Sequence, residues 1–132
     1  PNFRQQVMRE AAMGFPSLSI QEETVTGAHS VVENIIRLRK NGVTALIVPS
    51  EGYEFRARQA IQLLGIKVPE EMALITWENP GESELYDPPQ TTVGQNFPLI
   101  VKTALDNLEA LIDGKEIRNV EVDYILHDRE SW

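Results

Sequence analysis

Two short runs of almost entirely apolar residues constrain the fold more than any other feature of this chain. They cover residues 43–48, with Thr44 as the one polar interruption, and residues 72–77. Such runs are typical of parallel strands that are buried on both faces. Between them, residues 53–64 carry apolar side chains at helical spacing, and Gly65 ends the pattern. A strand, a helix and a second strand in this order predict a βαβ unit with a right-handed crossover.

The rest of the chain continues this alternation of helices and strands. Apolar spacing predicts further helices over residues 2–13, 27–40 and 97–112, and further strands over residues 17–21, 91–95 and 120–127. Ser50 is expected to cap the middle helix and Asn96 the last one, where Pro98 takes a favoured early position. In the last strand, Tyr124 and Leu126 are expected on the apolar face. The sequence therefore predicts an α/β fold, a parallel sheet flanked by helices.

Charge and composition exclude several classes of protein. The net charge of -8 repels nucleic-acid phosphates, so this chain by itself is not expected to bind DNA. The absence of cysteine excludes disulfides, thiolate nucleophiles and cysteine-based metal sites. No apolar run approaches the roughly 20 residues of a membrane span, and the N-terminus has no signal-peptide core. We expect a cytoplasmic protein with no membrane partner, although the chain does not begin with Met.

The common catalytic signatures are missing from the sequence. It contains no nucleophile elbow, no P-loop, no dinucleotide fingerprint and no zinc-protease motif. His29 and His127, the two histidines, lie at a predicted helix start and near the chain end, without an evident nucleophile or ligand partner. We therefore expect no enzyme activity, no metal and no cofactor. An acid/base enzyme that uses Glu51 and Glu78 is the alternative.

Ligands of open parallel sheets bind beyond the carboxyl ends of the strands. Ser50 follows the first apolar strand, and Trp77 and Glu78 end the second. An indole can stack on a sugar face, and a carboxylate can accept hydroxyl hydrogen bonds. Trp77 could equally be a core or interface aromatic, and the spacing alone does not decide between ligand binding and a solvated acidic loop for Glu78. Glu82 and Glu84 fit such a loop better than a hard-cation site.

Three further side chains have two interpretations. Phe97 and Tyr86 share the ambiguity of Trp77 between a stacking surface and a packing aromatic. Arg4, in the first predicted helix, could fork onto a hydroxyl pair or a carboxylate, whereas its residue type and position alone favour a surface arginine.

Two motifs resemble those of LacI/GalR-type repressors. Residues 65–79 read GIKVPEEMALITWEN, similar to that family's Gly-hydrophobic-x-Val-Pro-x-Asp, apolar strand and Gly-aromatic-Asp-Asp. Residues 88–97 read PPQTTVGQNF, similar to its Pro-Pro-x-Thr-Thr-hydrophobic-x-Gln crossing segment. Thr76 and Glu78 depart from the family's Gly and first Asp. The resemblance covers essentially the whole chain and is strongest from residue 43 onward.

The resemblance implies a periplasmic-binding-protein-like domain of two lobes hinged by crossing strands. Residues 1–87 would be the C-terminal effector-binding lobe, and residues 88–132 the crossing segment, returning helix and final strand. The first lobe and the helix-turn-helix head would then lie outside this chain, and the apolar face of helix 97–112 would need another cover, such as a partner chain.

The resemblance also assigns candidate residues. Those matching the family's ligand contacts, with Trp77 as a stacking plane, are Arg4, Ser50, Trp77, Glu78, Gln95 and Phe97. Those matching its dimer contacts are Phe55, Arg58, Gln59, Gln62 and Tyr86. The chain is thus expected to sense a sugar or similar small polar metabolite, to form a homodimer and to control DNA only through the absent head. A transport-type periplasmic sugar-binding protein is the alternative. Because half the cleft would be missing, we expect weak or undetectable sugar binding.

Overall fold

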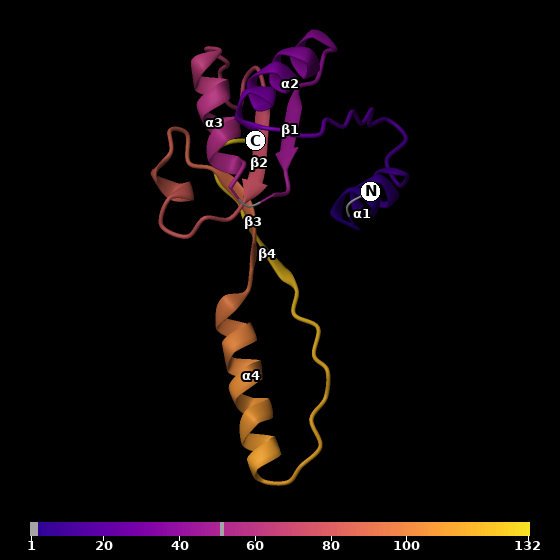
Figure 1. Ribbon diagram of the computed structural model, residues 1–132, viewed down its shortest axis with the longest axis vertical. Coiled ribbons are helices and arrows are strands. Elements are labelled where there is room, and N and C mark those ends of the chain that lie inside the picture. Colours follow the sequence, from indigo (N-terminus) through magenta and orange to yellow (C-terminus); the bar gives the residue numbers. More distant parts are fainter. Residues whose placement is uncertain (1–2, 51) are drawn as a thin grey trace.

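The computed structural model describes residues 3–50 and 52–132, without the side chains of residues 3–5 and 28. Figure 1 shows a head built around a small sheet, a long arm that contains α4, and α1 set apart at the N-terminal end. The elements in chain order are α1 (Phe3–Ala12), α2 (Ala28–Lys40), β1 (Ala45–Val48), α3 (Glu54–Leu63), β2 (Ala73–Trp77), the 3-10 turn η1 (Ser83–Leu85), β3 (Thr91–Gln95), α4 (Phe97–Ile112) and β4 (Tyr124–His127). Among the described residues, no helix combines the length and apolar character needed to cross a membrane.

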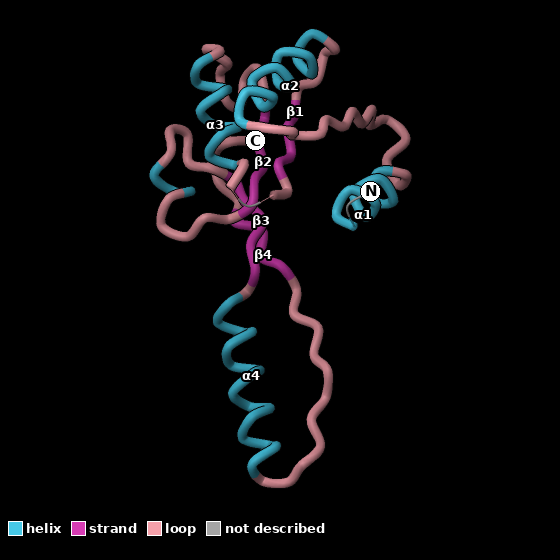
Figure 2. The backbone as a smooth tube through the Cα atoms, in the orientation of Figure 1, coloured by secondary structure: helices cyan, strands magenta, loops and turns pink. Residues whose placement is uncertain are grey.

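The four strands form one mixed sheet in the order β1-β2-β3-β4. β1 pairs in parallel with β2, which places Val48 opposite Thr76, and β2 pairs in parallel with β3. β4 runs antiparallel to β3 and places Tyr124 opposite Gln95. Figure 2 shows β3 and β4 leaving the head together as a two-stranded ribbon. The predicted α/β fold with parallel strands and helices is confirmed, and the final strand adds an antiparallel edge.

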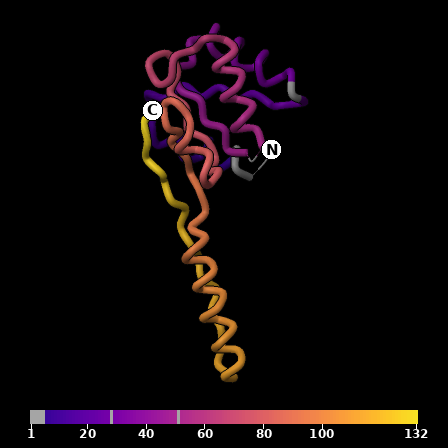
Figure 3. Tube along the Cα trace, turned by 90° about the vertical axis from the view of Figure 1, so that its left-hand side faces the viewer, coloured from indigo at the N-terminus to yellow at the C-terminus, as the bar shows by residue number. Residues whose placement is uncertain are grey.

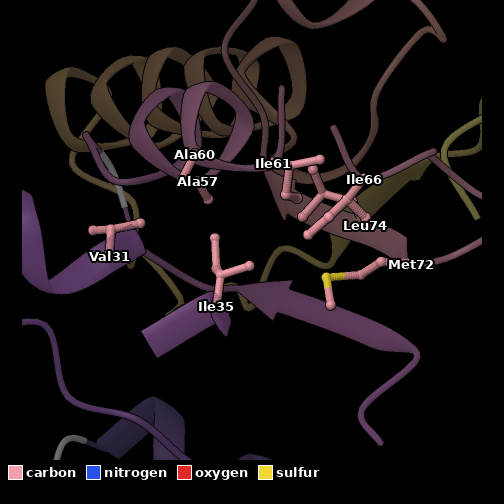
Figure 4. Close-up of a cluster of buried hydrophobic side chains, with 8 residues drawn as sticks. All are labelled: Val31, Ile35, Ala57, Ala60, Ile61, Ile66, Met72 and Leu74. Carbon is pink, nitrogen blue, oxygen red and sulfur yellow. The ribbon is translucent and has the colours of Figure 1, made fainter. Parts of the chain in front are cut away.

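The hydrophobic core lies between α2, α3 and one face of the sheet. Figure 4 shows its side chains pointing toward one another from these elements. Its members are Val31, Ile35, Ala57, Ala60, Ile61, Ile66, Met72 and Leu74. Leu46 and Val48 of β1 pack against this cluster. This single layer of helices on the sheet holds the carboxyl ends of β1 and β2 in place.

Two strand predictions were wrong, one about the burial of β1 and one about residues 17–21. Ile47 is 51% exposed, so β1 is buried on one face only, although its apolar run predicted burial on both. Residues 17–21 form no strand. These residues lie outside the sheet, so they have no paired strand, and Leu18 and Ile20 are exposed.

The beginning of α3 and the orientation of β4 also differ from expectation. Ser50 does not cap α3, since that helix begins after Tyr53, and only the Ser50 carbonyl accepts a bond from the Tyr53 amide. In β4, Tyr124 and Leu126 are the exposed residues, and the alternate positions are half-buried. Asn96 does cap α4 as predicted, because its side chain accepts a hydrogen bond from the Leu99 amide (3.2 Å).

The helix α4 carries a broad apolar face that the described chain leaves open. Figure 3 shows α4 and the returning segment extending away from the head. None of its residues is buried, and its exposed apolar residues are Phe97, Leu99, Ile100, Val101, Leu105, Leu108, Leu111 and Ile112. A soluble helix with such a stripe normally packs it against another element.

Gly94 in β3 permits a close approach between two strands. A Cβ atom added there would lie 2.7 Å from the Glu78 Cβ and 3.4 Å from the His127 Nε2. We therefore expect Gly94→Ala to lower the free energy of unfolding by about 1–3 kcal/mol, because strand and side chain must shift. Urea denaturation measures this. Gly14→Ala is the control, since its Cβ would lie 3.4 Å from the nearest atom, and equal losses in both variants would contradict the prediction.

Candidate functional site

The carboxyl ends of β1 and β2 meet at one edge of the sheet, which we call the rim. It comprises the residues directly after the two strands, among them Ser50 and Glu78. β1 ends at Val48 and β2 at Trp77, so Ser50 and Glu78 each follow the carboxyl end of one of two neighbouring parallel strands. The structure therefore places these two residues at the same edge, as the predicted βαβ unit implied. Ser50 is half-buried there.

The Glu78 carboxylate forms an ion pair within the chain. Arg129 Nη1 donates to Glu78 Oε2 (3.1 Å) and Arg129 Nη2 to Oε1 (3.2 Å), and the Thr92 hydroxyl also donates to Oε2. The Glu78 side chain is only 10% exposed, and that of Arg129 is 17% exposed. A ligand hydroxyl would therefore meet a carboxylate whose orientation is already fixed.

Two other candidate ligand residues, Trp77 and Gln95, lie at the ends of β2 and β3 and face the opposite side of the sheet from Glu78. Successive strand residues point to opposite faces, so Trp77 and Glu78 diverge. Trp77 packs edge-on against Tyr124 of β4, with ring centroids 5.3 Å apart, and Tyr124 lies opposite Gln95. The sheet therefore divides the predicted ligand residues, with Trp77 and Gln95 on one face and Glu78 on the other. A ligand that touches both groups must sit across the edge of the sheet.

Phe97 and Gln95 lie where β3 passes into α4. Both are exposed, and Phe97 is the first residue of that helix. Two other candidates, the side chain of Arg4 and residue Glu51, lie outside the described residues. The ligand role of every predicted residue stays a prediction.

Sequence reasoning missed three polar residues: Arg129, which holds Glu78 at the rim, and Gln90 and Ser131, which join β2 to β3 and to the chain end. Gln90 and Ser131 are buried, and the Ser131 hydroxyl accepts from the Gln90 side chain (2.9 Å) and from the Thr91 amide (2.8 Å). The Leu74 amide donates to the Ser131 carbonyl (2.7 Å), which ties the chain end to β2. A signal was present for Gln90 alone, because it belongs to the motif of residues 88–97, yet it carried no ligand assignment.

The predicted dimer residues lie along α3 and the loop that follows η1. Phe55, Gln59 and Gln62 are exposed on α3. Arg58 instead turns inward, where it donates to the Pro88 carbonyl (3.1 Å) and lies 5.2 Å from the Tyr86 ring centroid. Arg58 therefore holds this loop against α3 within one chain.

Burial raises the pKa of Tyr86, and the nearby carboxylates of Glu82 and Glu54 raise it further, while Arg58 opposes them. Desolvation lowers the pKa of Arg58. The neutral phenol is thus the form that the folded loop favours.

Tyr86 should make the protein less stable at alkaline pH. Its pKa is raised on folding, so its contribution is fully present below the unfolded value of about 10 and is lost as pH rises through the folded value. Urea denaturation at about pH 8 and about pH 10.5 should therefore show a larger loss of stability for the wild type than for Tyr86→Phe. The same loss in both proteins would contradict this.

The remaining features of the surface do not add a second site. Glu82 accepts a hydrogen bond from the Asn79 side chain at 2.5 Å, as in an ordinary loop, and Glu84 is exposed. No group of three or more His, Cys, Asp or Glu within the described residues could hold a metal ion. His29 is exposed on α2, and His127 is half-buried beside Gly94. Shallow hollows along α1 and along α4 contain none of the predicted ligand residues.

A model of the periplasmic binding protein-like domain matches residues 2–132. The chain belongs to this family. The lactose operon repressor of Escherichia coli K12 is 27% identical over 93 residues, which cover 69% of this chain and 26% of that protein. The resemblance to LacI-type regulators is thereby confirmed.

Solved structures of LacI-type regulators share the fold. A LacI family transcriptional regulator from Bifidobacterium animalis subsp. lactis has a TM-score of 0.78 at 24% identity, covering 97% of this chain and 48% of that chain. A Lac repressor dimer bound to operator and the anti-inducer ONPF has a TM-score of 0.74 at 24% identity, covering 97% of this chain and 40% of that chain. This periplasmic-binding-protein-like chain thus spans half the length of these structures or less.

Proposed function

We propose that this chain is the ligand-sensing part of a LacI/GalR-like regulator and binds a sugar or a similar small polar metabolite at the rim. The observation that supports the proposal is that Ser50 and Glu78 follow the carboxyl ends of two neighbouring parallel strands, where sheets of this class bind ligands. Trp77, Gln95 and Phe97 lie at the same end and supply aromatic surface and an amide. Bond-making chemistry is not part of the proposal.

The rim forms one wall of a cleft in this proposal, and a second lobe forms the other. The open apolar face of α4 supports it, because the helix is the natural surface for that lobe to cover. The chain also spans 48% of a relative with the same fold. The regulator would act in the cytoplasm. It would bind DNA through a head domain that is not part of this acidic chain.

A homodimer through α3 and the Tyr86 loop completes the proposal. The support is the exposure of Phe55, which is 49%, with Gln59 and Gln62 beside it on α3. A Lac repressor that shares the fold is a dimer. Arg58 and Tyr86 would act here by shaping the loop that the partner meets.

Titration calorimetry of the chain with a panel of neutral monosaccharides tests the ligand proposal. We expect dissociation constants weaker than micromolar, since one wall supplies only part of the contacts. Any heat seen at high sugar concentration should fall with Gln95→Ala and with Trp77→Ala. Micromolar affinity for any monosaccharide would contradict the one-wall arrangement.

Two other functions make different predictions. A transport-type binding protein would have a signal sequence encoded upstream of this segment. An acid/base enzyme using Glu51 and Glu78 would show turnover that disappears in Glu78→Gln. The ion pair of Glu78 with Arg129 favours the regulator, because both carboxylate oxygens already accept hydrogen bonds from within the chain.

A further inference from the structure

Arg129 joins the chain end to the crossing strand β3. It lies two residues after β4, and its amide donates to the Thr91 hydroxyl (2.9 Å). Its Nη1 also donates to the Gln90 carbonyl (2.7 Å) and to the Thr92 hydroxyl (3.0 Å). Both the backbone and the side chain of Arg129 are thus attached to the beginning of β3.

The same guanidinium binds both oxygens of the Glu78 carboxylate at the rim. Two of its nitrogens each donate a hydrogen bond to one oxygen of Glu78, in the planar bidentate geometry that suits a carboxylate. The described bonds to Glu78 use three of its roughly four acceptor positions, which leaves room for a hydroxyl donor. Because both side chains are largely buried, solvent screens this pair much less than a surface pair.

We propose that Arg129 is the positioning residue of the rim, which fixes the Glu78 carboxylate in one orientation and couples it to the crossing strand β3. A ligand hydroxyl bound by Glu78 would then act directly on the segment that connects the head to α4. This last step rests on the proposed function, whereas the fixed carboxylate does not.

A double-mutant cycle on the folding equilibrium of the full chain measures the coupling. The cycle combines Glu78→Gln with Arg129→Gln, and the matched control combines Glu71→Gln with Arg39→Gln, an ion pair whose side chains are 38% and 44% exposed. We expect a coupling of about tenfold or more for the rim pair. The exposed control pair should give less than about fivefold.

The order of the Glu78 side chain separates positioning from a merely structural role. It is measured by 13C relaxation in the wild type, Arg129→Gln and Arg129→Lys. Compared with glutamine, lysine restores the positive charge but cannot form the bidentate hydrogen bonds. We therefore expect Arg129→Lys to recover part of the stability lost in Arg129→Gln while the Glu78 side chain stays mobile. If Arg129→Gln does not fold, the comparison of Arg129→Lys with the wild type still tests the order of the Glu78 side chain.

Two results would overturn the inference. One is a Glu78 side chain that stays as ordered in Arg129→Lys as in the wild type. The other is a rim coupling no larger than that of the control pair. Neither measurement uses a ligand, so failure to bind any sugar would count against the proposed function alone.

Discussion

Replacing Leu105 and Leu108 with glutamine should weaken any self-association of the chain through α4, while an α3 interface would be left intact. These side chains are 60% and 53% exposed at the centre of the open face of α4. An apolar stripe of this kind drives association, because burial contributes about 25 cal/mol per Å² of apolar surface. Glutamine keeps the helix propensity and removes most of that gain. Sedimentation velocity should show at least a tenfold fall in the association constant.

The matched control is Lys102→Gln with Glu109→Gln on the same helix. It changes two exposed residues without altering the net charge, so the association constant should stay the same. An association constant that is the same for the wild type and for the Leu105→Gln, Leu108→Gln variant, or a wild type that is monomeric at high concentration, would contradict this prediction.

Leu74→Ala should produce the largest loss of stability among single substitutions considered. Leu74 is fully buried in β2 and packs in the one hydrophobic cluster under α2 and α3. Removing a buried leucine costs about 3–5 kcal/mol, which includes the cavity left behind. Small domains have only about 5–15 kcal/mol in total, so the variant should be partly unfolded at physiological temperature.

Leu63→Ala is the control for this substitution. Leu63 is 76% exposed at the end of α3, so we expect a change of less than about 0.5 kcal/mol in the free energy of unfolding. Urea denaturation of both variants measures these changes in the free energy of unfolding. Similar losses for Leu63→Ala and Leu74→Ala would show that the core does not lie where the structure places it.

Local sequence patterns predicted the central part of the fold. The apolar runs gave β1 and β2, the 3.6-residue spacing gave α2, α3 and α4, and Asn96 marked the start of α4. These features depend on neighbours along the chain or on one shared face, which periodicity reports directly. The strand order β1-β2-β3-β4 was not predicted from the sequence and came from the structure.

Features that depend on absent or distant neighbours could not be predicted. Residues 17–21 have strand periodicity, yet nothing beside them completes the hydrogen bonding. The exposed face of β4 has the apolar Tyr124 and Leu126 because the ribbon leaves the head and has no layer to cover it. Periodicity identifies an apolar face but not whether another element covers it.

The candidate site was predicted as a location rather than as a set of contacts. The predicted βαβ unit placed Ser50 and Glu78 at one edge. The pairing of Glu78 with Arg129 links residues 51 positions apart, and no local pattern encodes it. The separation of Trp77 from Glu78 by the plane of the sheet, in contrast, follows from strand alternation and could have been predicted from the sequence.

Mapping sugar binding by NMR tests the central claim most directly. Amide shifts of the 15N-labelled chain would be followed during titration with neutral monosaccharides to high concentration. A ligand wall at the sheet edge predicts that the shifts cluster at Ser50, Trp77, Glu78 and residues 95–97, and saturate only at about millimolar concentrations. Shifts that cluster on another surface, or that saturate at micromolar concentrations, would contradict it.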